Sequence, residues 1–201
     1  MKKTFKILGC ATVLVFSLII AFIIFGIFGF RFNPEMAARA HFAVEKEKVA
    51  SSLIDFMIGP HRIYIFETDS TYLTVLARRS VLLWRSNDSV WIKKFNDKIV
   101  TIGIYSLNED HIEDRFTLLA FINNDSNITY IEAGPPSERL RLNTPEGEIT
   151  LFLWNKSIPW NDWNAIAYTV DHEALYELRY EVNNGILHSD GLRWHRIENM
   201  G

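Results

Sequence analysis

The sequence is poor in cysteine, with a single one, Cys10, in 201 residues. One cysteine excludes an intrachain disulfide framework and any zinc site built from several cysteines. The sequence also lacks an excess of charge of either sign, since 21 lysines and arginines stand against 24 aspartates and glutamates. We therefore expect no nucleic-acid-binding surface and no acidic tail. The length suffices for one domain with a hydrophobic core and attachments, but not for a large multidomain enzyme.

Motifs that commonly carry catalysis or cofactor binding are missing as well. The sequence contains no Gly-x-Ser-x-Gly nucleophile elbow, no His-Glu-x-x-His zinc motif and no glycine-rich phosphate loop. Four carboxylates lie within the six residues from Glu109 to Asp114, but they lack the ligand spacing and central glycine of an EF-hand loop. We interpret this segment as a solvated acidic loop, and we expect no cofactor, no metal site and no enzymatic activity.

The sequence does contain one long uncharged run near its start. The 24 residues from Ile7 to Phe30 carry no charge, and 16 of them are Ile, Leu, Val or Phe. As a helix the run is about 36 Å long at about 1.5 Å per residue, enough to cross a hydrocarbon layer of about 30 Å. The sequence therefore predicts a transmembrane helix over residues 7–30, with the lipid bilayer as its partner.

The charges before this run set its expected orientation. Three lysines join the terminal amine within residues 1–6, and the positive-inside rule places such a tail in the cytoplasm. Residues 31–201 then lie outside, and the protein is expected to be a single-pass protein of the cell membrane. The small-x-small pattern that ends at Ala40 leaves cleavage after that residue as an alternative.

The part of the chain from residue 31 onward is acidic and contains no cysteine. Without the three N-terminal lysines there are 18 basic and 24 acidic residues, a net charge of −6. An acidic domain does not hold anionic polymers by charge, so we expect no nucleic-acid partner. The absence of cysteine fits the outer face of a bacterial membrane better than a secreted eukaryotic domain, where disulfides are common.

Residues 31–60 are predicted to form an amphipathic linker helix of about 25 residues. Asn33-Pro34-Glu35 is a helix start signal, because asparagine can cap and proline suits the first helical position. Gly59-Pro60 supplies the stop. Apolar residues recur at helical spacing between these signals, at Phe42, Val49, Leu53 and Phe56. We interpret this stripe as a face that docks on the main domain rather than as a coiled-coil seam, because heptads are not sustained.

From residue 61 to residue 201 the pattern changes to short segments rich in β-branched and aromatic residues, separated by turn clusters. The predicted strands are 61–68, 72–79, 98–106, 115–122, 128–133, 148–154, 165–170, 174–182 and 192–197. No long helical pattern lies between them to carry a parallel crossover. We therefore expect a mainly β fold in which an antiparallel domain follows the two helices. The pattern leaves open whether that domain is a single sheet, a sandwich or a partial barrel.

The most distinctive stretch of the β domain runs from Trp154 to Asn164 and places aromatic rings beside amide and carboxylate groups. Apolar ring faces stack on sugars while polar groups hold the hydroxyls, so this stretch is a candidate site for a cell-wall glycan. The candidate binding residues are Trp154, Trp160, Asn161, Asp162 and Trp163. Tryptophans also fill cores and form contacts between proteins, and both of these interpretations stay open.

Four further stretches carry a resemblance to a known group of proteins. They are Tyr130-Ile131-Glu132-Ala133-Gly134-Pro135, Trp160-Asn161-Asp162-Trp163-Asn164-Ala165-Ile166-Ala167, Leu175-Tyr176 and Leu192-Arg193-Trp194-His195. The combination resembles small single-pass membrane-anchored proteins of Gram-positive bacteria that have no assigned activity. The resemblance covers most of the β domain and implies a location at the membrane, but it brings no catalytic residues with it.

Taken together, these patterns favour a membrane-anchored module that binds a partner outside the cytoplasm. A protein at the outer membrane face is one such partner. The alternatives are a glycan-binding domain and a cell-envelope hydrolase, and no pattern predicts an oligomeric state. Two carboxylates meeting in one cleft would favour the hydrolase. An exposed Trp160 or Trp163 would favour the glycan-binding domain, and an exposed apolar patch or an unpaired sheet edge would favour an interaction module.

Overall fold

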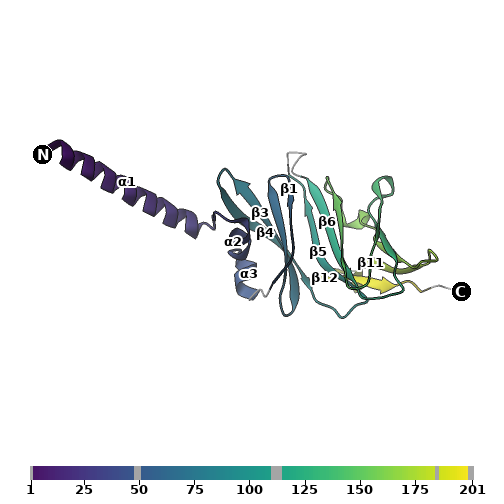
Figure 1. Cartoon of the computed structure of the whole chain (residues 1–201). Helices are drawn as coiled ribbons and strands as arrows, with labels where there is room; N and C mark the ends of the chain where they lie inside the picture. Colours follow the sequence, from purple (N-terminus) through teal and green to yellow (C-terminus); the bar gives the residue numbers. More distant parts are fainter. Residues whose placement is uncertain (1, 48–50, 110–114, 184–185, 199–201) are drawn as a thin grey trace.

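The chain begins with a helix that projects from a body of β-strands (Figure 1). In a computed structural model of the protein, residues 2–47, 51–109, 115–183 and 186–198 are described, without the side chains of residues 2–12, 18, 24, 42, 47, 181–183 and 186–190. The projecting helix is α1 (Lys2–Ile27). Two short helices, α2 (Pro34–Arg39) and α3 (Phe42–Glu47), follow it and lie beside the first strands.

The described residues form three antiparallel sheets. The first sheet has the strand order β1 (Ser51–Ile58), β2 (His61–Glu67), β3 (Thr71–Ser80) and β4 (Leu83–Lys93). The central sheet has the order β5 (Ile99–Leu107), β6 (Phe116–Asn123) and β9 (Ile149–Trp154). The last sheet has the order β12 (Ile186–Arg196), β11 (Ala174–Asn183), β10 (Ile166–Tyr168), β7 (Tyr130–Ala133) and β8 (Leu140–Asn143). The expectation of a mainly β, antiparallel domain is therefore confirmed.

The central sheet is covered on both faces. Successive side chains of a strand point to opposite faces, so Leu118 and Ala120 pack with Ile63 of the first sheet. Leu119 and Phe121, which alternate with them along β6, point to the opposite face and pack into a second cluster with residues of the last sheet. This two-sided burial explains why β6 is a nearly continuous apolar run instead of an alternating one.

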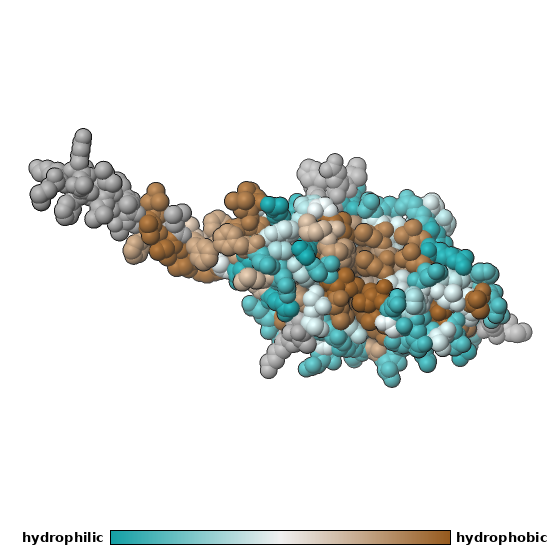
Figure 2. Space-filling view, in the orientation of Figure 1, coloured by the Kyte–Doolittle hydropathy of each residue, from teal (hydrophilic) through white to brown (hydrophobic). Residues whose placement is uncertain are grey.

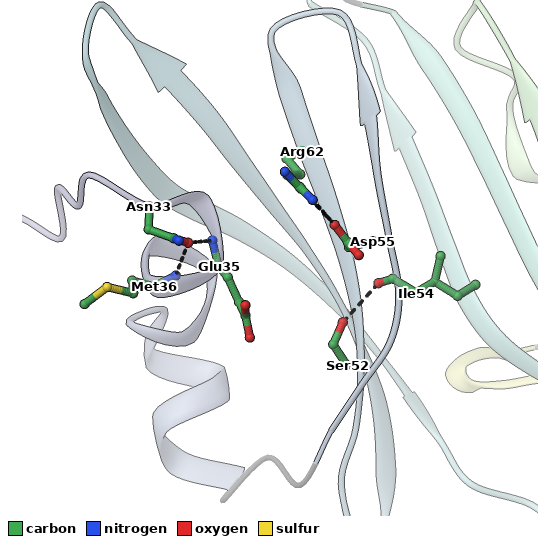
Figure 3. A network of polar contacts seen from close by, with 7 residues as sticks. All are labelled: Asn33, Glu35, Met36, Ser52, Ile54, Asp55 and Arg62. Carbon is green, nitrogen blue, oxygen red and sulfur yellow. Dashed lines mark hydrogen bonds and ion pairs between the residues drawn. The ribbon is translucent and has the colours of Figure 1, made fainter.

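Helices α2 and α3 cover the outer face of the first sheet. Ala38 and Val44 are buried there in one cluster with Tyr64 and Phe66 of β2. The first turn of α2 is fixed by Asn33, whose side-chain oxygen accepts hydrogen bonds from the backbone N–H groups of residues 35 and 36, at 2.8 and 3.3 Å (Figure 3). The start signal at Asn33-Pro34-Glu35 is therefore confirmed.

The single linker helix predicted over residues 31–60 is wrong. The chain forms two short helices there, and residues 51–58 form the edge strand β1. Phe56 pairs with Ile63 across the ladder, and Asp55 forms an ion pair with Arg62 of β2 (Figure 3). The spacing of Leu53 and Phe56 fits a helix, but strand pairing with β2 lets Phe56 pack against the cluster between the first and central sheets.

The nine strands predicted from residue 61 onward all coincide with strands of the structure, and β4 and β8 were not predicted. The middle of β4 reads Arg85-Ser86-Asn87-Asp88-Ser89, which looks like a turn cluster. It is nevertheless a strand because β4 lies at the edge of the first sheet, where polar side chains can reach solvent. Strand β8 has four residues, too few for a periodic pattern.

The membrane-spanning helix predicted over residues 7–30 falls mostly within α1. In the part of the chain that is described, no helix is both long enough and apolar enough to cross a membrane. The span therefore stays a prediction.

We expect a pH dependence of stability from His41, which lies between α2 and α3. Its side chain is 4% exposed, and its Nδ1 accepts a hydrogen bond from the backbone N–H of Ala43 at 3.3 Å. Burial lowers the pKa of His41 below its ordinary 6.5, and the opposing effects of Asn87 and Asp88 are smaller. The unfolded chain therefore takes up a proton at His41 at a higher pH than the folded protein does. The stability that this difference contributes is present above pH 6.5 and is lost as the pH falls below it.

The measurement is urea unfolding of the full chain in detergent, between about pH 8 and about pH 5.5. The His41→Gln variant removes the titrating ring while it keeps a polar side chain, so its unfolding midpoint is expected to change less over this range. Equal slopes for both proteins would show that His41 does not carry the effect.

Candidate functional site

The predicted binding stretch lies in the connection between β9 and β10, which contains a single 3₁₀ turn, η3 (Trp160–Asp162). Pro159 enters the turn in an extended conformation, and Trp163 closes it with a backbone hydrogen bond to the carbonyl of residue 160. In a 3₁₀ turn, residues three apart lie on the same side. Trp160 and Trp163 consequently line the same two clefts, one on each side of the turn.

The three predicted tryptophans have different environments. Trp160 is 48% exposed, whereas Trp163 and Trp154 are buried. The indole N–H of Trp163 donates to the carbonyl of Ile158 at 3.1 Å, and that of Trp154 donates to the carbonyl of Glu138 at 3.0 Å. Trp154 stacks on a phenylalanine ring in the core and lines neither cleft. Trp154 therefore fills the core, and it is not among the residues that line the clefts.

The other two predicted residues lie on the turn itself. Asn161 is exposed and lines the second cleft, and Asp162 is half-buried and lines neither cleft. The structure thus brings Trp160, Asn161 and Trp163 together at the clefts.

The first cleft has a volume of about 520 Å³ and lies where the first sheet, the central sheet and the η3 connection meet. Its lining residues are Val90, Ile104, Tyr105, Ser106, Asn108, Arg115, Lys156, Ser157, Ile158, Pro159, Trp160 and Trp163. The lining combines aromatic and aliphatic side chains with hydroxyl, amide and cationic groups. A cavity of this size and mixed character is typical of sites that bind small molecules.

A hydroxyl network holds the wall of the first cleft in place. Thr117 of β6 is fully buried, and its Oγ1 accepts a hydrogen bond from the backbone N–H of Ile158 at 2.7 Å and donates to the carbonyl of Lys156 at 2.9 Å. The Ser106 hydroxyl lies 3.1 Å from that of Thr117 and 2.9 Å from that of Ser157. These contacts tie the η3 connection to the central sheet, and they leave serine hydroxyls at the cleft.

The Thr117→Val variant tests this network. Valine keeps the shape of threonine but cannot accept the hydrogen bond from Ile158, so a buried backbone N–H loses its partner. We expect the free energy of unfolding to fall by about 1–3 kcal/mol, measured by urea unfolding. The matched control is Thr150→Val, whose hydroxyl is hydrogen-bonded to another threonine hydroxyl and to no backbone group. A loss no larger than that of the control would contradict the anchoring role of Thr117.

The second cleft lies on the other side of Trp160, between the η3 connection and β11, and has a volume of about 260 Å³. Tyr180 of β11 meets Trp160 edge to face, with ring centroids 4.9 Å apart. Asn161 and Asn164 are among its lining residues, and Asn164 has a left-handed backbone with a φ of +40°. Trp160 therefore stands between two clefts and is supported by a second aromatic ring.

Two titratable groups at the clefts, Tyr105 and Glu177, have defined partners. Burial, followed by a hydrogen bond from its hydroxyl to Asp88, raises the pKa of Tyr105, so this residue stays protonated and acts as a donor. The described lining of the first cleft includes no carboxylate, and in the second cleft Glu177 forms an ion pair with Arg179 at 2.7 Å. The carboxylate pair that would favour a hydrolase is thus not found among the described residues of either cleft.

Within the described residues, no three histidine, cysteine, aspartate or glutamate side chains cluster in a way that could hold a metal ion. The acidic segment between Glu109 and Asp114 lies, apart from Glu109 itself, outside the described residues. Glu109 forms an ion pair with Arg78 at 2.9 Å, and its backbone carbonyl accepts a hydrogen bond from Arg115 at 2.7 Å.

A separate apolar surface lies between the first and central sheets. Strands β1 and β9 end these two sheets, so each has one edge without a neighbouring strand among the described residues. Ile149 and Leu153 of β9 are 37% and 36% exposed, and Leu151 and Phe56 are partly buried close by. Figure 2 shows a brown patch over this part of the body. An apolar patch and open sheet edges are the features expected of an interaction module.

The residues that complete the clefts could not be found from local sequence. Ser106 and Tyr180 come from different strands and are brought to Trp160 by sheet pairing and layer packing, and Thr117 of a third strand anchors the wall from behind. No family model, curated protein or solved structure matches the chain. The resemblance to membrane-anchored proteins of Gram-positive bacteria accordingly stays a prediction.

Proposed function

We propose that the protein is a single-pass, membrane-anchored binding module whose β domain lies outside the cytoplasm and holds a small glycan at Trp160. The anchor is the uncharged segment of residues 7–30, and the lysine-rich tail of residues 1–6 is cytoplasmic. The observation that carries the binding part of the proposal is the half-exposed Trp160, which separates two clefts lined by hydroxyl and amide groups.

The exposure of α1 supports the anchor. This helix projects from the body (Figure 1). Large apolar side chains along it are exposed. The described residues of α1 that are exposed in this way are Val13, Leu14, Val15, Phe16, Ile19, Ile20, Phe22, Ile23, Phe25 and Ile27. Surface of this extent is unfavourable in water, and a lipid environment would remove that cost.

The chemistry of the clefts supports a sugar as ligand. A pyranose ring offers an apolar face that stacks on an indole, and its hydroxyls need donors and acceptors at the edge of the stack. Ser106 and Ser157 supply hydroxyls on one side of Trp160, and Asn161 supplies an amide on the other. On the outer face of a bacterial membrane, the glycan that such a site would meet is that of the cell wall.

The binding test is a calorimetric titration of the full chain, in detergent, with soluble cell-wall glycan fragments. We expect the Trp160→Ala variant to weaken binding by at least about tenfold, the equivalent of about 1.4 kcal/mol. The matched control is Trp91→Ala, because Trp91 is similarly exposed, at 53%, and lies on β4 without lining either cleft. Absence of binding, or equal affinity of both variants, would reject the glycan site.

The anchor and its orientation are tested separately. A reporter enzyme that is active only outside the cytoplasm, fused after Gly201, is expected to be active, and the same reporter fused before Met1 is expected to be silent. Alkaline extraction of the membranes is expected to leave the protein in the pellet. Release into the supernatant would reject the anchor, and the reverse reporter pattern would reject the orientation.

A second candidate function is the binding of a protein at the outer membrane face. The apolar surface between β1 and β9 favours it, because an added strand could pair with an open edge while its side chains cover Ile149 and Leu153. Photo-crosslinking in intact cells from position 153, with position 126 in the exposed turn between β6 and β7 as control, would capture such a partner. Recovery of the same proteins from both positions would remove this candidate.

A further inference from the structure

The hairpin between β3 and β4 ends in two large apolar residues that are almost fully exposed. Val81 and Leu82 form its two-residue turn and are 86% and 72% exposed. Turns of this kind usually carry glycine or asparagine, because a residue with positive φ is needed. Val81 occupies that position with a φ of +56°, a strained conformation for a β-branched residue. The stability of the hairpin alone would therefore favour glycine or asparagine in place of Val81 at this tip.

The tip is held beside the end of α1. Arg31, four residues after the last residue of α1, forms an antiparallel bridge with Trp84, with backbone N–H to carbonyl distances of 2.8 and 2.7 Å. Trp84 is the second residue of β4, so the turn at Val81 and Leu82 lies next to the point where the helix meets the body. Figure 2 shows brown atoms along the helix and again at the end of this hairpin.

The apolar surface continues from the helix to the hairpin. Ile27 and Phe28 at the end of the helix are 77% and 58% exposed, and Phe32 is 70% exposed. Together with Val81 and Leu82, these side chains form an apolar rim at one end of the body, which we call the basal rim. No described segment of the protein covers it.

Arginines surround the basal rim. The Arg31 guanidinium donates to the carbonyls of Gly26 and Phe30, at 2.8 and 2.9 Å, and so caps the end of the helix. Arg85 lies over the ring of Phe30, 5.3 Å from its centroid, and the Nε of Arg79 donates to the carbonyl of Val81 at 3.2 Å. Among the described residues, none of these three arginines has a carboxylate partner.

We propose that the basal rim is a second membrane contact, in which the β3–β4 hairpin tip enters the lipid surface from which α1 emerges. This rests on the proposed anchoring of residues 7–30. Val81 and Leu82 reach the boundary between headgroups and acyl chains, while Arg31, Arg79 and Arg85 meet anionic lipid headgroups. A lipid surface is the occupant that these features favour, because the rim is continuous with the apolar helix and its charges are of one sign.

The test uses the full chain in vesicles of phosphatidylcholine and phosphatidylglycerol, in a Cys10→Ser background. An environment-sensitive fluorophore is attached through a Leu82→Cys substitution, and in a control protein through Ser126→Cys, in an exposed turn outside the rim. Lipids with a spin label in the upper acyl chain then quench probes that enter the membrane. We expect quenching at position 82 to exceed that at position 126 by about threefold or more.

The outcomes separate this contact from the anchor. Vesicle flotation after alkaline treatment reports on the anchor alone, and release of the protein there would reject the proposed anchoring. Retention of the protein combined with equal quenching at positions 82 and 126 would overturn the hairpin contact and leave the anchor intact. Omission of phosphatidylglycerol, or the combined Arg79→Gln and Arg85→Gln substitutions, should reduce quenching at position 82. No reduction in either case would overturn the role of the arginines.

Discussion

Replacing Phe121 with alanine is expected to lower the free energy of unfolding by about 3–5 kcal/mol. The ring is fully buried between the central and last sheets, and it meets Phe152 and Trp194 edge to face, with centroid distances of 6.0 and 5.1 Å. Neither neighbour can close the gap, because each is held by its own strand. The loss is a large part of the total stability of about 5–15 kcal/mol that is usual for a domain.

Urea unfolding of the full chain in detergent, followed by tryptophan fluorescence, measures this loss. Trp91→Ala serves as the control, because it also removes a large aromatic side chain, but one that is 53% exposed. We expect it to cost no more than about 1 kcal/mol. Similar losses for the two variants would mean that the layers do not pack as described.

The second large effect is expected at Gly134, which follows β7. Its φ of +101° is unfavourable for any residue with a side chain, and an added Cβ would lie 2.9 Å from Cζ2 of Trp154 and 3.1 Å from the carbonyl oxygen of Glu138. The indole cannot move aside on its own, because its N–H is bonded to that same carbonyl. Gly134→Ala is therefore expected to cost about 2–5 kcal/mol, from backbone strain and overpacking together.

Gly147→Ala separates the two causes. Gly147 also has a positive φ, +77°, but an added Cβ there would have no atom within 4 Å. Only the strain remains, and we expect a loss of about 1 kcal/mol. The difference between the two variants in the same unfolding experiment gives the cost of the contact with Trp154. A difference near zero would show that Trp154 does not confine this turn.

The sequence predicted most of the strands because their residues alternate or form short apolar runs between turn clusters. It did not predict β1 and β4, for opposite reasons. In β1, the three-residue spacing of Leu53 and Phe56 is that of a helix, whereas a regular strand would place them on opposite faces. A register shift between Ser52 and Ile54 lets the strand pack both side chains against the same cluster. In β4, the polar residues around Asn87 look like a turn, and the edge position makes a strand possible.

The candidate site was predicted in part. The cluster of tryptophans pointed to a segment in which Trp160, Asn161 and Trp163 line clefts, and binding there stays a prediction. Sequence alone could not tell that Trp154 faces the core while Trp160 faces outward, because burial depends on which layer covers each strand. Tyr180, which supports Trp160 from another strand, had no local signal at all.

The bridge between Arg31 and Trp84 leaves three residues, 28–30, between the end of α1 and the first sheet. So short a connection has almost no slack, in contrast to a flexible linker whose reach grows with the square root of its length. If lipid holds α1, the domain cannot search the space above the membrane. It would work at one fixed height and at one angle set by the helix, so its ligand would have to come to the membrane surface.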